Sequence, residues 1–175
     1  PPIAPLRFHN AWFTLLVNND LELPEAGDEL VEFRWVKPGQ AMAAWRDGEM
    51  LIPPPIVQAL RAFEAAQEQM EDTDLIFAEA SRLSVLHEPP RIEFAWPVEC
   101  IPLSTHTLPP ATHTNAYLLG IPGNGGLLID PTVHNDEAEE MLAFCIQRFE
   151  ETGGSIDRVI ISHRHSDHRP NMKRL

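Results

Sequence analysis

Cysteine and basic residues are scarce in this sequence. Its 175 residues include two cysteines, Cys100 and Cys145, and 13 lysines and arginines against 26 aspartates and glutamates. Two cysteines cannot build a disulfide framework, and we interpret both as core thiols rather than metal ligands. The formal net charge of −13 argues against a general nucleic-acid-binding protein, because phosphate contacts need clustered lysine and arginine. The net charge does not argue against a local basic groove on part of the surface.

Long hydrophobic runs are also missing. No apolar stretch approaches the roughly 20 residues that a membrane-spanning helix needs, and the first residues do not show the charged-then-apolar pattern of a signal peptide. We therefore expect no membrane association and a cytoplasmic location. The apolar content of 43%, with 22% charged residues, is typical of a globular protein with a packed core.

Three histidines and an aspartate lie within six residues near the end of the chain, after a β-branched run at 159–161 that predicts a short buried strand. Residues two apart in an extended chain point to the same side, so His163 and His165 can bind one metal ion. The turn that follows directs Asp167 and His168 towards another. Imidazole nitrogen with a carboxylate favours zinc, with iron and manganese as alternatives.

The spacing of these histidines separates the pattern from another zinc motif. In H-E-x-x-H the two histidines are four apart on a helix, whereas His163 and His165 are two apart where a strand ends. A helical zinc-protease site is therefore excluded in this segment.

The string His163-x-His165-x-Asp167-His168 after an apolar strand resembles the signature of the metallo-β-lactamase superfamily of metallo-hydrolases. The resemblance covers about residues 97–168. It implies an α/β (α+β) fold class, in which residues 97–175 form the N-terminal part, an incomplete half, of a metallo-β-lactamase-like αββα sandwich. The glycine-rich turn at residues 121–126 independently predicts a hairpin between strands 116–120 and 127–130. An apolar stripe predicts an amphipathic helix that starts at residue 135 or 136 and ends at Gly153-Gly154.

The same resemblance implies the chemistry of the site. His163 and His165 would bind a first zinc ion and Asp167 and His168 a second. Asp167 would also orient the metal-bound hydroxide or accept its proton, and Asp130 would support the ligand loop without binding metal. Zinc lowers the pKa of bound water to about 7. The implied activity is hydrolysis of an ester, a thioester, a lactam or a phosphodiester.

The family completes both metal sites with further ligands well downstream of this motif. The sequence begins at Pro1 and ends at Leu175, seven residues after His168. We therefore expect the chain to be a fragment of a longer protein, to bind zinc weakly if at all, and to be inactive alone.

Residues about 10–63 resemble, more weakly, the C-terminal part of a Nudix hydrolase domain, an incomplete Nudix-like α/β segment. The resemblance rests on a predicted strand at Leu30–Val36, a proline-rich stretch at residues 51–55 and a helix after it. The family's glutamate-rich magnesium box is missing. The expected organisation is a Nudix-like part over residues 1–64, a helical linker over 65–96 and the metallo-β-lactamase-like part over 97–175.

Two other functions fit the same residues. The histidine cluster could be a relic within a non-catalytic interaction module. It could also be a structural zinc clip, which needs a fourth ligand close in space, with His106, His113 and His134 as candidates. For the hydrolase we expect a small-molecule substrate, and nucleic acid is kept as the alternative substrate. The sequence does not determine the oligomeric state.

Overall fold

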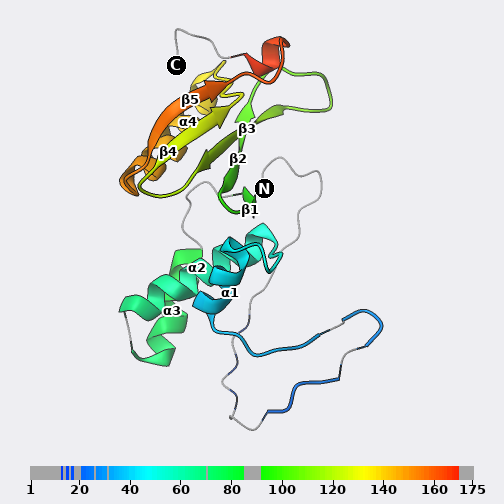
Figure 1. Cartoon of the computed structure of the whole chain (residues 1–175), viewed down its shortest axis with the longest axis vertical. Coiled ribbons are helices and arrows are strands. Elements are labelled where there is room, and N and C mark those ends of the chain that lie inside the picture. Colours follow the sequence, from blue (N-terminus) through cyan, green and yellow to red (C-terminus); the bar gives the residue numbers. More distant parts are fainter. Residues whose placement is uncertain are drawn as a thin grey trace.

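The structure is a computed structural model that describes residues 13, 15, 17, 21–25, 27–30, 32–69, 71–84 and 92–169. It is a mixed α+β arrangement in which three helices gather in one part and a five-stranded sheet with a fourth helix forms another (Figure 1). The elements are α1 (Pro38–Arg46), α2 (Pro54–Gln69), α3 (Thr73–Ser84), β1 (Ile92–Ala95), β2 (Val98–Ser104), β3 (His113–Gly120), β4 (Gly125–Ile129), α4 (Asp136–Glu151), β5 (Ser155–Ile160) and the 3-10 turn η1 (Ser166–His168).

The sheet has the strand order β1-β2-β3-β4-β5. Its first four strands pair antiparallel, and the predicted hairpin is confirmed as β3 and β4. β5 then pairs parallel to β4, from Gly125 opposite Ser155 to Ile129 opposite Ile160. A parallel pair needs a crossover connection, which α4 supplies. The carboxyl ends of β4 and β5 therefore lie side by side at the same end of the sheet, and the ligand loop begins there (Figure 1).

The main core lies between α4 and one face of the sheet. The predicted helix is confirmed: Asn135 caps it, because its side-chain oxygen accepts a hydrogen bond from the Ala138 amide at 2.8 Å. An ion pair between Arg148 and Glu99 joins α4 to β2. The core consists of apolar residues from both layers: Ile101, Leu103, Ala116, Leu118, Leu128, Val133, Ala138, Leu142, Cys145 and Phe149.

The helical part contacts the sheet through β1 and the turn after it. Arg61 of α2 donates to the buried Glu93 of β1, with 3.0 Å between Nη2 and Oε1. The Arg61 guanidinium also lies 5.7 Å from the ring centre of Trp45, whose indole is 6.1 Å from that of Trp96. A paired buried carboxylate such as Glu93 is tolerated only because its partner is present.

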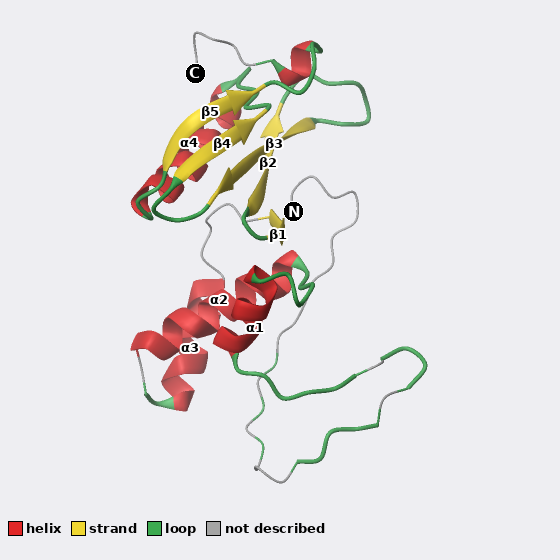
Figure 2. Ribbon diagram, viewed as in Figure 1, coloured by secondary structure: helices red, strands yellow, loops and turns green. Residues whose placement is uncertain are grey.

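The strand predicted at Leu30–Val36 is wrong for the residues that the structure describes. Residues 32–36 form a loop (Figure 2), and Trp35 is 63% exposed. A strand needs a neighbouring strand to satisfy its backbone groups, and none of the described strands pairs with this segment. The Nudix-like arrangement proposed for residues 10–63 therefore has no strand at residues 32–36, and residues 10–12, 14, 16, 18–20, 26 and 31 lie outside the described ranges.

The boundaries between the three expected parts stay a prediction. α2 runs from Pro54 to Gln69 and so continues through residues 64 and 65, and β1 belongs to the sheet although it falls within the expected helical linker. Among the described helices, none is both long and apolar enough to cross a membrane.

The β-branched run before the ligand loop does form a strand, but the prediction that it is buried is wrong. Val159 and Ile160 of β5 are each 47% exposed. Among the described strands, β5 pairs with β4 alone and so lies at the edge of the sheet. An edge strand packs against one neighbour instead of two, so its apolar side chains keep part of their contact with solvent.

Candidate metal centre

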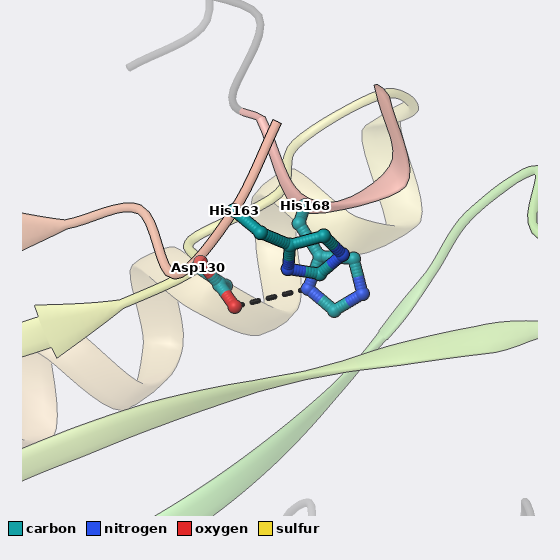
Figure 3. A group of neighbouring side chains, drawn as sticks. All are labelled: Asp130, His163 and His168. Carbon is teal, nitrogen blue, oxygen red and sulfur yellow. Dashed lines mark hydrogen bonds and ion pairs between the residues drawn. The ribbon is translucent and has the colours of Figure 1, made fainter. Parts of the chain in front are cut away.

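The site is built where β4 and β5 end. Asp130 follows β4 directly, and its amide donates to the carbonyl of Ile160 at 2.8 Å, which ties the two strand ends together. Its φ of 49° lies in the left-handed region, which aspartate and asparagine tolerate better than most other residues. The side chain of Asp130 is turned towards the loop that carries the histidines (Figure 3), and the residue is 4% exposed.

The Asp130 carboxylate accepts three hydrogen bonds. The Ser162 amide donates to Oδ1 at 2.6 Å, while the Ser162 hydroxyl and the Nδ1 of His168, at 2.9 Å, donate to Oδ2. Burial raises the pKa of Asp130, but the hydrogen bonds from Ser162 and His168 outweigh it and hold the pKa below the ordinary aspartate range. The group is therefore a buried, fully ionised anion at neutral pH.

These hydrogen bonds determine where the histidines carry their protons. A carboxylate only accepts, so Nδ1 of His168 must carry a proton and, in the neutral ring, Nε2 has a free lone pair. The single Ser162 hydroxyl proton goes to Asp130, so His163 Nδ1, 2.9 Å from that oxygen, must donate to it. Nε2 of His163 is then also an acceptor. In the neutral ring of each histidine, Nε2 is therefore the nitrogen without a proton, and so the one that can bind a metal ion.

Asp130, His163 and His168 form a group that could hold a metal ion. One ligand atom from each lies within 4.8 Å of the others, and the three side chains converge in Figure 3. Two imidazoles with one carboxylate are a donor set that suits zinc, iron or manganese. The sequence predicted Asp130 only as a support for the ligand loop. The signal that could have placed it in this group is its position at the end of a strand.

His165 approaches His163 from within the same loop. Its Nδ1 lies 3.0 Å from Nε2 of His163. Two nitrogens on one tetrahedral zinc, each about 2.0–2.1 Å from the ion, lie about 3.4 Å apart. At 3.0 Å the two nitrogens are instead hydrogen-bonded, with His165 Nδ1 donating to His163 Nε2 in the neutral ring, and His165 lies outside the three-residue group.

Asp167 is held at a different place. Its Oδ2 accepts from the Thr107 hydroxyl at 2.6 Å and lies 3.9 Å from Nε2 of His168. The Thr107 hydrogen bond is the main reason that the pKa of Asp167 lies below its usual range. On another side, His134 Nε2 donates to the Ser166 carbonyl at 2.9 Å. Two loops from elsewhere in the fold therefore contact the turn that carries Asp167 and His168.

The other candidate ligands lie outside the three-residue group. His106 is exposed, His113 contacts the Thr112 hydroxyl at 2.8 Å, and His134 is engaged with Ser166. Both cysteines are buried and free of disulfides. Burial, with a smaller effect of Glu99, raises the pKa of the Cys100 thiol, which disfavours the thiolate that a metal would need.

Asp130→Asn is expected to lower the free energy of unfolding by about 1.5–3 kcal/mol at pH 7, since hydrogen bonds to a buried anion are lost while the left-handed backbone is still tolerated. The folded-state pKa lies below the unfolded value of about 3.9, so this stabilisation is present above about pH 5 and is lost as pH falls through the folded value. Urea unfolding from pH 7 to pH 2.5 measures it. The difference between wild type and variant should shrink below about pH 4, and a constant difference would contradict the assignment.

The comparisons with known proteins concern this part of the chain. Those with curated proteins and with solved structures gave no significant match. The Nudix resemblance of residues 10–63 received no support. A family model described as the metallo-beta-lactamase superfamily matches residues 109–169. This range contains Asp130 and the whole of the histidine loop, so the segment that builds the candidate metal centre is the segment that is similar to the metallo-beta-lactamase superfamily.

Proposed function

We propose that the chain carries the metal-binding segment of a metal-dependent hydrolase. The observation that carries this proposal is the convergence of Asp130, His163 and His168 at the joined ends of two parallel strands. In the neutral ring of each histidine, the hydrogen bonds that lead to this buried anion leave Nε2 as the nitrogen that can bind a metal ion. The match of residues 109–169 to the metallo-beta-lactamase superfamily supports a hydrolytic reaction.

Zinc is the proposed metal, with two ions in the complete protein. His163 and His165 would hold the first ion and Asp167 and His168 the second, with Asp130 beside both pairs. Bound zinc would supply a nucleophilic water at neutral pH, because it lowers the pKa of that water to about 7. Iron or manganese would suit the same nitrogen and oxygen donors.

The chain's own residues have separate tasks in this scheme. Asp130 orients His168 directly and His163 through the Ser162 hydroxyl. Asp167 is ionised at neutral pH, since its pKa is lowered by the Thr107 hydrogen bond, and it is the group we propose to orient the attacking water or to take its proton. The substrate would be a small molecule with an ester, thioester, lactam or phosphodiester bond. A cytoplasmic location stays a prediction.

Metal content and metal removal test the proposal. Zinc per chain is measured by elemental analysis in the 175-residue chain and in the product of the complete gene. Hydrolysis of chromogenic ester, thioester, lactam and phosphodiester substrates is then followed before and after treatment with a chelator. We expect about two zinc ions in the complete product, activity that disappears with the metal and returns with added zinc, and weak zinc binding without activity in the 175-residue chain.

The other readings predict different results. A structural zinc clip would hold one tightly bound ion and show no hydrolysis of any substrate. A non-catalytic module with a relic cluster would hold no metal in either chain. Turnover by the 175-residue chain alone would contradict the expectation that it is inactive.

A further inference from the structure

The side chain of Asp167 is contacted by a residue far away in the sequence. Thr107 lies in the loop between β2 and β3, and its hydroxyl donates to Oδ2 of Asp167 at 2.6 Å across 60 residues. Asp167 itself belongs to η1, a single turn whose backbone-to-backbone hydrogen bonds join residues within 165–169. Besides Thr107, the Asp167 carboxylate interacts with the backbone of Asp167 itself and with His165 and His168, which all lie in the ligand loop.

The Thr107 loop is itself held in shape. The Thr105 amide donates to the Thr112 carbonyl at 3.1 Å and so closes the loop where β2 and β3 begin to pair, and the Thr107 amide donates to the Thr105 carbonyl at 3.2 Å. The Ala111 amide donates to the Leu108 carbonyl at 3.1 Å. The position of a hydroxyl on such a loop is fixed, and the hydroxyl can orient a side chain on the separate turn η1.

The chemistry of the contact suits an ionised ligand. A carboxylate only accepts hydrogen bonds, and a hydroxyl bonded to it at 2.6 Å is a short, charge-assisted contact. With Oδ2 engaged, rotation of the carboxylate about its last bond is restricted. The direction of the group is then determined before any cation arrives, which reduces the cost of ordering it on binding.

We propose that Thr107 is a positioning residue of the metal centre, whose hydroxyl holds the Asp167 carboxylate in the orientation that binds the second metal ion. This inference rests on the proposed function, because it assigns Asp167 as a ligand. It adds the β2–β3 loop to the parts of the chain that build the centre.

The test compares three variants of the complete gene product. Thr107→Val removes the hydroxyl with little change of shape, and Thr107→Ser keeps it. Thr112→Val is the matched control, since it makes the same change in the same loop, where the hydroxyl contacts His113 instead. The affinity for each zinc ion is measured by competition with a chromogenic chelator, and the melting temperature is measured on metal-free protein.

For Thr107→Val we expect the second zinc ion to bind about 10–100-fold more weakly, the range found when residues that orient ligands are removed. Thr107→Ser and Thr112→Val should bind zinc as the wild type does, and the metal-free melting temperatures should agree. Unchanged zinc affinity in Thr107→Val would overturn the inference while leaving the metal centre intact. A loss of metal-free stability in Thr107→Val, with or without rescue by serine, would show that Thr107 anchors the loop and would also overturn the inference. A wild type that binds no zinc would contradict the proposed function itself.

Discussion

Replacing Phe149 with alanine is expected to lower the free energy of unfolding by about 3–5 kcal/mol, the range for deleting a buried aromatic ring. Phe149 lies on the last turn of α4, is 8% exposed and belongs to the main core. The whole domain is expected to be stable by only about 5–15 kcal/mol. The loss would therefore remove a large share of the stability, and urea unfolding followed by circular dichroism measures it.

Three glycines leave the space that the Phe149 ring fills. A methyl group added at Gly120, Gly126 or Gly154 would come within 2.4, 2.7 and 2.4 Å of the ring, respectively. Gly120→Ala is therefore expected to be destabilising by overpacking, by about 1–3 kcal/mol.

A matched control is Phe144→Ala, which makes the same change on the same helix at a residue that is only partly buried. It should cost less than Phe149→Ala. In the double variant Gly120→Ala with Phe149→Leu, the smaller side chain should recover part of the loss caused by the glycine substitution, a coupling that a double-mutant cycle isolates. Equal costs for the two phenylalanines would show that the glycine-lined space has no special role.

Replacing His163 with alanine is expected to weaken zinc binding by more than 100-fold in the complete gene product. His163 takes part both in the three-residue group with Asp130 and His168 and in the close pair with His165. Removing an orienting residue costs about 10–100-fold in metal affinity, and the loss of a ligand should cost more. Elemental analysis after gel filtration, with chelator competition for the affinity, measures the change.

The control for this prediction is His113→Ala. His113 is the first residue of β3. It contacts the Thr112 hydroxyl and lies outside the three-residue metal group. It should keep the zinc content of the wild type. If both variants retained zinc, the metal would lie elsewhere, and if both lost it, the β2–β3 loop would contribute a ligand that the present geometry does not show.

The parts of the fold that the sequence predicted well are those with strong local signals. The helix at Asp136–Glu151 combines a capping asparagine with an apolar stripe, and the hairpin of β3 and β4 has a glycine-rich turn with Gly123 at a φ of 77°. Both elements are specified by neighbouring residues, so no knowledge of the tertiary structure is needed to find them.

The relation of Asp130 to His163 and His168 could not be read from local patterns. It depends on the parallel register of β4 and β5, which places residues 130 and 162 side by side across 32 positions of sequence. The contact of Thr107 with Asp167 is similarly long-range. The strand expected at Leu30–Val36 failed for the opposite reason, because its strong local pattern has no partner strand among the described residues.

The position of β5 affects how the protein behaves in concentrated solution. One side of this strand bonds to β4, and among the described strands none pairs with its other side. Asp157 and Arg158 place charges in the middle of the strand, which discourages strand addition by another molecule. Beyond them, Val159, Ile160 and Ile161 are 38–47% exposed and carry no charge. Aggregation of the 175-residue chain is therefore expected to begin by intermolecular strand pairing at the carboxyl end of β5, next to the histidine loop.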